Sequence, residues 1–207
     1  MPRAKFVDHR YGIQRRELEL YGRKLTMLPV KIALFSNLVK LDIACNNLVE
    51  LDGTILPASL ETLYCNNNRL RTIKNLKAGL LELYCWGNEL EELEGLPYTL
   101  VKLRCCDNQI ARMDYLPISL RSLYCIRNLL TRLDFLPIGL RVLVCYGNPL
   151  EEMRNVPPYL CEVIMPPELL GLTYYQSLQQ LSEFEKRHLV ELPDSIVEIN
   201  GMDAKIS

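Results

Sequence analysis

The sequence repeats itself every twenty residues through most of its middle. A column of leucines sets this period, and a second column of apolar residues follows three positions later. In a solenoid each repeat is one supersecondary unit, and neighbouring repeats bury a shared core that no single repeat could form alone. The first column holds Leu60, Leu80, Leu100, Leu120, Leu140 and Leu160, and the second holds Leu63, Leu83, Leu103, Leu123, Leu143 and Val163.

Cysteine and asparagine recur with the same period. The cysteines stand two residues after the second apolar column, and the asparagines stand three residues after the cysteines. Each regular unit therefore reads L-x-x-L-x-C-x-x-N-x-L, and in most units a Leu-Pro pair follows. The cysteine ladder consists of Cys65, Cys85, Cys105, Cys125 and Cys145, and the asparagine ladder consists of Asn68, Asn88, Asn108, Asn128 and Asn148.

This unit resembles the leucine-rich repeat, L-x-x-L-x-L-x-x-N/C-x-L, with cysteine in place of the middle leucine. The short unit with its Leu-Pro pair is most similar to the repeats of type III-secreted bacterial effectors, and similar arrays occur in amoebae and their giant viruses. The resemblance implies an α/β leucine-rich-repeat solenoid, a curved right-handed superhelix with a parallel β-sheet on its concave face. Twenty residues leave no room for a full helix on the convex side, which we expect to be extended or polyproline-like.

We expect a single domain over residues 1–207. Residues 1–17 are predicted to form an N-terminal cap, and residues 18–165 are predicted to form the repeats. The period breaks over 166–189, where apolar residues recur at three- and four-residue steps, which predicts one helix as an insertion or cap. Residues 190–207 restart the motif as a final strand and tail, so nine short strands are expected along the chain.

Composition favours a protein of a reducing compartment. The N-terminal residues have no apolar segment typical of a signal peptide, and no run approaches the roughly 18 apolar residues of a membrane span. The formal net charge of −1 gives no overall attraction to nucleic acid. We therefore expect a cytoplasmic protein (in the host cytoplasm if the source is a pathogen or virus), with no nucleic-acid or membrane partner.

The two ladders each allow a chemical and a structural interpretation. Five thiols at one repeat position invite a metal or redox site, but parallel side chains do not converge on one point as zinc ligands must. Packing as small buried apolar groups is favoured. The asparagines could form a polar ladder that touches a ligand, but pairing with backbone groups is favoured, because an unpaired buried amide costs about 1–3 kcal/mol. No nucleophile elbow, phosphate loop or zinc-protease motif occurs, so we predict no enzyme, no cofactor and no metal.

Alternation along each strand predicts which side chains face outward. Because Leu63 and Cys65 are expected to point inward, positions 62, 64 and 66 and their equivalents are expected on the concave face. Tyrosine, tryptophan and arginine are enriched at the centres of protein interfaces. The predicted partner-binding residues at these positions are Tyr64, Tyr84, Trp86, Arg104, Tyr124, Ile126 and Tyr146.

Three interpretations of this outward strip stay open: binding of another protein, self-association, and a simple preference of aromatic residues for strands. Binding of another protein is favoured, which predicts a non-enzymatic scaffold or adaptor. The alternative is a self-associating or structural subunit, such as a component of a virion or other assembly.

Overall fold

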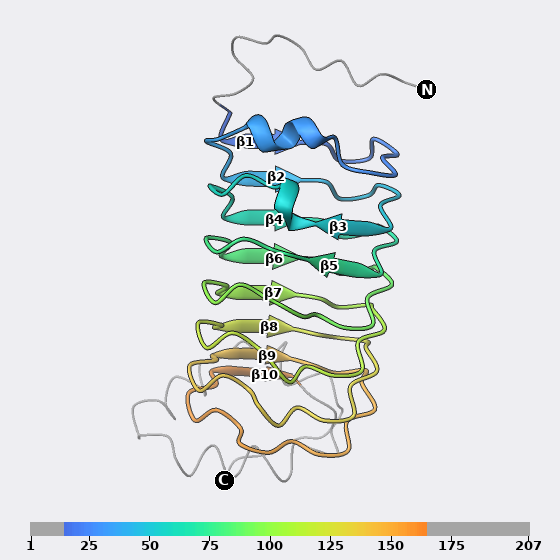
Figure 1. Ribbon diagram of the computed structural model, residues 1–207. Coiled ribbons are helices and arrows are strands. Elements are labelled where there is room, and N and C mark those ends of the chain that lie inside the picture. The colour runs from blue at the N-terminus through green and yellow to red at the C-terminus, as the bar shows by residue number, and fades with distance from the viewer. Residues whose placement is uncertain (1–14, 165–207) are drawn as a thin grey trace.

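The chain winds into a stack of parallel coils, seen side-on in Figure 1; the computed structural model describes residues 15–164. Each coil adds one three-residue strand to an eight-stranded parallel sheet, and the order of strands in the sheet follows the order in the chain. The strands are β1 (Glu17–Glu19), β2 (Lys40–Asp42), β4 (Thr62–Tyr64), β6 (Glu82–Tyr84), β7 (Lys102–Arg104), β8 (Ser122–Tyr124), β9 (Val142–Val144) and β10 (Glu162–Ile164). Each coil therefore pairs only with its neighbours, as the repeat predicts.

Equivalent residues of successive repeats lie side by side in the sheet. Leu63 pairs with Leu83, and Tyr84 pairs with Arg104. The middle residue of each strand from β1 to β8 is buried, while its two neighbours are exposed or half-buried. The predicted alternation is thus confirmed, and from β4 to β10 the register of the sheet follows the twenty-residue period.

One apolar core runs the length of the stack. The leucines of both columns and all five cysteines of the cysteine ladder are buried in it. Leu70, Leu90, Ile110 and Leu130 close the core beyond the end of each strand, and none of them has measurable exposure. The core is therefore made of stacked columns, so that each apolar side chain packs against the same kind of side chain above and below.

The far side of the coils, opposite the sheet, has an extended backbone. There β3 (Glu50–Asp52) and β5 (Thr72–Lys74) form a second, two-stranded parallel sheet. The only helices between residues 15 and 164 are two short 3₁₀ helices, η2 (Val30–Leu34) and η3 (Gly53–Ile55). The α/β class is therefore not confirmed for this part of the chain, which is a parallel β-solenoid. A coil of twenty residues consists of one strand, two turns and an extended return, and has no room for an α-helix.

Some predictions lie outside the described residues. These are the helix over 166–189, the final strand and tail over 190–207, and most of the cap over 1–17. Eight of the nine predicted strands are present in the main sheet, whereas the return strands β3 and β5 had been expected only as extended chain. The curvature and hand of the superhelix stay predictions.

Each coil turns sharply just after its strand. The fourth residue after the strand's middle residue has a positive φ, between 49° and 70°, in seven successive coils. Only glycine takes this conformation without steric cost. In six of the seven coils the backbone N–H of the residue at this position donates to a carbonyl of the next coil, and this hydrogen bond holds the turn in place. The residues are Gly22, Cys45, Asn67, Gly87, Asp107, Arg127 and Gly147.

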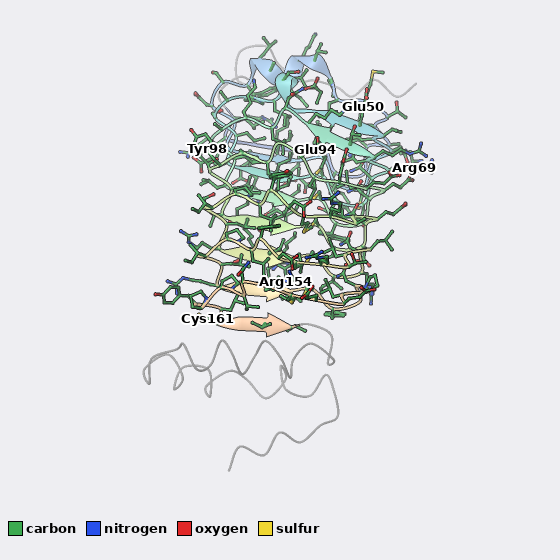
Figure 2. The ribbon with its side chains drawn as sticks, turned by 60° about the horizontal axis from the view of Figure 1, so that its bottom comes forward. Glu50, Arg69, Glu94, Tyr98, Arg154 and Cys161 are labelled. Atoms are coloured by element: carbon green, nitrogen blue, oxygen red, sulfur yellow. The ribbon has the colours of Figure 1, made fainter. Side chains whose placement is uncertain are left out.

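The two edges of the solenoid, where the chain leaves and re-enters the sheet, carry exposed side chains. Figure 2 shows Arg69 and Tyr98 pointing away from the body on opposite sides. Arg69 follows β4, and Tyr98 precedes β7. The sheet lies between these edges, so its outer face is a surface separate from both.

Candidate functional site

The candidate site lies on the outer sheet face, which we define as the first and third residues of the sheet strands together with the second residue after each strand. Strands in a sheet lie about 4.8 Å apart. Equivalent outward side chains of neighbouring coils are therefore within contact distance of one another. All seven residues predicted from the sequence occupy positions on this face.

Four of these residues form a continuous stack across β4, β6, β7 and β8. The rings of Tyr64 and Tyr84 are parallel, with centroids 4.4 Å apart and planes inclined by 10°. The guanidinium carbon of Arg104 lies 5.8 Å from the ring centroid of Tyr84 and 4.4 Å from that of Tyr124. We call Tyr64, Tyr84, Arg104 and Tyr124 the aromatic–arginine stack; the arginine is held between two ring faces by cation–π contacts.

Two lysines and one carboxylate support this stack. Lys40 Nζ lies 5.6 Å from the Tyr64 ring centroid, and Lys102 Nζ lies 5.6 Å from that of Tyr84. The Tyr84 hydroxyl donates to Glu82 Oε2 at 2.7 Å. Burial raises the pKa of the Tyr84 hydroxyl well above its usual value, and the hydrogen bond to Glu82 raises it further. Tyr84 is therefore a neutral donor with a fixed ring.

A shallow hollow of about 260 Å³ adjoins the stack over β7, β8 and β9. We call it the Trp86 hollow, after the only tryptophan of the chain. Asp107 and Arg127 reach it from the turns after β7 and β8, and their side chains pair with each other at 3.2 Å. The hollow is lined by Trp86, Arg104, Cys106, Asp107, Tyr124, Ile126, Arg127 and Tyr146.

A second hollow, of about 560 Å³, lies near β2 and contains none of the predicted site residues. It is lined by Arg16, Ser36, Asn37, Val39, Ser59 and Glu61. These polar and small side chains bring no aromatic ring to it. The Trp86 hollow, although smaller, is the one that combines aromatic, aliphatic and cationic groups, as ligand sites commonly do.

The structure thus brings five of the seven predicted residues together at the Trp86 hollow and places Tyr64 and Tyr84 beside them in the stack. Three outward positions differ from expectation, because Ala44, Asn66 and Val144 are buried. Each is a small side chain next to a large one in the neighbouring coil. Trp86 stands beside Asn66, and Tyr124 pairs with Val144. Alternation alone does not account for such shielding.

The sequence analysis missed Asp107 and Arg127. Both occupy the left-handed turn position, not a strand, so a prediction based on strand alternation could not include them. A signal was nevertheless available, because that column reads glycine, asparagine or a charged residue in most coils. Charged residues there lie at the exit of the sheet, next to the outward side chains.

Each side chain of the asparagine ladder joins two coils. Asn128 is typical: its Nδ2 donates to the carbonyls of Cys105 at 3.0 Å and Cys125 at 3.1 Å. Its Oδ1 accepts from the backbone N–H of Ile110 at 3.1 Å. The same pattern of bonds extends to Asn46 in an earlier coil, which bonds the backbone of Leu20 and Leu25. The amides therefore satisfy backbone groups inside the turns.

The buried thiols of the cysteine ladder have low reactivity at neutral pH. Burial raises the pKa of Cys145 to about 12, and it raises the pKa of Cys85, Cys105 and Cys125 well above the usual thiol value. Thiols with raised pKa values are poor nucleophiles and poor metal ligands at neutral pH. Within residues 15–164, no group of three or more histidine, cysteine or acidic side chains is placed to hold a metal ion.

Solved structures of bacterial leucine-rich-repeat proteins match the chain. The leucine-rich-repeat domain of a Shigella effector matches with a TM-score of 0.64 and 27% identity, over 82% of this chain and 78% of that domain. YopM from Yersinia enterocolitica matches with a TM-score of 0.55 and 28% identity, over 73% of this chain and 38% of YopM. The chain is a leucine-rich-repeat protein with effector-like repeats.

A third match shows the fold of this leucine-rich-repeat protein again. The functional domain of InlJ from Listeria monocytogenes, which includes a cysteine ladder, has a TM-score of 0.61 at 22% identity, over 77% of this chain and 41% of that one. No protein-family model and no curated protein sequence matches the chain. None of the helices described between residues 15 and 164 has the length and apolarity that crossing a bilayer requires.

Proposed function

We propose that this leucine-rich-repeat protein is a non-enzymatic protein-binding scaffold or adaptor whose partner sits on the outer sheet face. The observation that carries the proposal is the contiguity of the aromatic–arginine stack and the Trp86 hollow. The fold of the matched structures supports an interaction scaffold, because solenoids of this kind bind through an extended surface. Tyrosine, tryptophan and arginine are the residue types that dominate binding energy at interfaces.

Strand preference alone explains the stack less well than binding does. Aromatic residues suit strands, but strand preference gives no reason for Trp86 to keep 36% of its surface exposed beside a hollow. Buried apolar surface contributes about 25 cal/mol per Å² when a partner covers it. The exposed part of Trp86 and the half-buried rings of Tyr124 and Tyr146 are therefore the groups that gain most from a partner.

The chemistry of the hollow supports a binding role over a catalytic one. General acid–base chemistry commonly uses histidine, and both histidines of the chain, His9 and His188, lie outside residues 15–164. The Cys106 thiol has a pKa raised mainly by burial, which opposes its use as a nucleophile. We extend the proposal to a single domain of a reducing compartment such as the cytoplasm, because closely packed free thiols suit reducing conditions.

The test is a pull-down from an extract of the source or its host. The variant Trp86→Ser/Tyr146→Ser removes two rings from the Trp86 hollow without touching the tyrosines of the stack. A matched control, Tyr115→Ser/Phe135→Ser, removes two aromatic side chains that are 86% and 64% exposed in the return segments. A protein captured by the wild type and the control but lost with the first variant supports the proposal.

Capture of the same proteins by all three baits would contradict it, provided that the three melt at similar temperatures. Self-association is examined with the same variants by sedimentation. A wild-type dimer that Trp86→Ser/Tyr146→Ser converts to a monomer would assign the outer sheet face to contacts between copies of this chain, as the structural-subunit alternative requires.

A further inference from the structure

The guanidinium of Arg104 is held in place but has no hydrogen-bond acceptor in the part of the chain that the structure describes. It is fixed between the rings of Tyr84 and Tyr124, with its carbon 5.8 Å and 4.4 Å from their centroids. No oxygen among residues 15–164 accepts a hydrogen bond from it, and its Nε is buried without a partner. Arginine carries five N–H donors in a planar fork that matches a carboxylate. The fixed, unpaired guanidinium of Arg104 is therefore available to pair with a carboxylate from a partner.

The neighbouring arginine on the hollow differs in this respect. Arg127 Nη1 donates to Asp107 Oδ1 at 3.2 Å, so its charge is already balanced. Asp107 is the one acidic residue that lines the Trp86 hollow. With that pair matched, Arg104 leaves one positive charge unbalanced at the hollow. A ligand that fills it gains by bringing one negative charge.

Charge is unevenly distributed along the strand positions of the outer sheet face. The first and third residues of β1, β2, β4 and β6 include four acidic side chains and a single lysine. On β7 these positions are Lys102 and Arg104, and on β8 and β9 they carry no charge. The acidic side chains are Glu17, Glu19, Asp42 and Glu82, and the lysine is Lys40. Attraction for a negative group is therefore confined to β7 and the hollow beside it.

The rest of the hollow accepts apolar groups. Trp86, Ile126 and Tyr146 line it from the coils of β6, β8 and β9. Ile126 follows Tyr124 by two residues, which puts an aliphatic side chain next to the aromatic end of the stack. A ligand group that meets Arg104 with a charge therefore meets an apolar surface next to it.

We propose that Arg104 and the Trp86 hollow form a site for a protein segment in which an Asp or Glu side chain stands next to a large apolar one. The carboxylate pairs with the Arg104 guanidinium, and the apolar side chain lies against Trp86, Ile126 and Tyr146. The site rests on the proposed function, since it gives the chemistry of the partner on the same face. A nucleic acid is disfavoured as the occupant, because its chain of phosphates would run along the acidic side chains of β1 to β6.

The experiment uses the full chain and an array of hexapeptides that combine Asp or Glu with Leu, Phe or Tyr. Each peptide is paired with its Asn or Gln counterpart. The best pair is then titrated in solution, with the fluorescence of Trp86 as the reporter, because it is the only tryptophan present. We expect the acidic peptide to bind at least tenfold more tightly than its amide counterpart. Arg104→Gln should abolish that preference.

Arg112→Gln is the matched control: it also removes one arginine charge, from a side chain that is 82% exposed in a return segment. It should leave the preference unchanged. Melting curves confirm that both variants are folded.

Four outcomes would overturn the assignment. Equal binding of acidic and amide peptides, or an unchanged preference in Arg104→Gln, would show that Arg104 does not read a carboxylate. If a twelve-nucleotide poly-uridine RNA, titrated by the same Trp86 fluorescence, binds more tightly than any peptide, the outer sheet face would be assigned to nucleic acid. If no peptide binds while the pull-down partner is still lost in Trp86→Ser/Tyr146→Ser, the carboxylate site is wrong and the proposed scaffold function stands.

Discussion

Arg121 occupies the space that Gly139 leaves open. A Cβ atom at position 139 would overlap the Arg121 guanidinium, whose Nη1 donates to the carbonyl of Leu120 at 3.1 Å. Elsewhere in the stack the equivalent carbonyl accepts from a hydroxyl of the next coil, as Leu100 does from Ser119 at 2.7 Å. Arginine thus supplies, in one coil, the hydrogen bond that serine or threonine supplies in others.

Because Arg121 replaces the hydroxyl donor that other coils have at the position of Gly139, we predict energetic coupling between positions 121 and 139. Arg121→Ala leaves the Leu120 carbonyl without its donor, so the free energy of unfolding should fall by about 1 kcal/mol. Adding Gly139→Ser should then restore the hydroxyl bond, with a coupling energy of about 1 kcal/mol in a double-mutant cycle. Urea denaturation of the four proteins measures it. Additive effects would show that the two groups do not substitute for each other; Arg141→Ala serves as a control at the equivalent exposed position.

Asn128→Ala should destabilise the fold without altering the outer sheet face. The change leaves the carbonyls of Cys105 and Cys125 and the N–H of Ile110 unpaired in buried turns. We expect the free energy of unfolding to fall by about 3 kcal/mol. The exposed neighbour Gln109→Ala should change it by less than about 0.5 kcal/mol. Peptide affinity, measured well below the melting temperature, should match the wild type; a loss of affinity in fully folded Asn128→Ala would indicate a direct role in binding.

Gly53→Ala tests the close approach of the return segments. A Cβ at this position would lie 2.5 Å from the carbonyl oxygen of Asn75 and 2.9 Å from the Cα of Leu76, and backbone atoms cannot move aside as a side chain can. Overpacking against backbone should lower the free energy of unfolding by about 2 kcal/mol. Gly95→Ala separates crowding from backbone strain, because position 95 has a positive φ but open space around it. It should cost about 1 kcal/mol. A smaller loss for Gly53→Ala than for Gly95→Ala would contradict the close contact.

Alkaline pH should unfold the protein through its cysteine ladder. Burial raises the pKa of these thiols in the folded chain, to about 12 for Cys145, whereas free thiols have a pKa of about 8.5. Below pH 8.5 both states keep the protons and stability is complete. Above it only the unfolded chain loses them, so stability falls by about 1.4 kcal/mol per pH unit for each such thiol, until the pH reaches the folded pKa.

Urea denaturation at pH 8.0, 9.0 and 9.5 measures this slope. The variant Cys105→Val removes one thiol, and a branched side chain should fit there because Ile43 holds the equivalent position and is fully buried. Its slope should be smaller by about 1.4 kcal/mol per pH unit. Identical slopes for the two proteins would mean that the ladder thiols are not the source of the pH dependence.

Much of the site was predictable because columns in the sequence become rows of neighbours in the sheet. Once Leu63 and Leu83 are aligned, Tyr64 must stand beside Tyr84 and Arg104 beside Tyr124. The return segments were harder to predict, because their residues do not alternate with a simple period. The strands β3 and β5 arise where two successive coils happen to have matching extended returns.

The sequence alone determined the register of the sheet from β4 onward, most of the core and the strand positions that face outward, because strict periodicity leaves only one way to stack those columns. Only the tertiary structure decided how side chains from different columns meet. Arg121 reaches into the space at Gly139, and Arg127 pairs with Asp107 across a turn. Such contacts depend on the side-chain conformations and turn angles that neighbouring coils leave available, and a repeat pattern specifies neither.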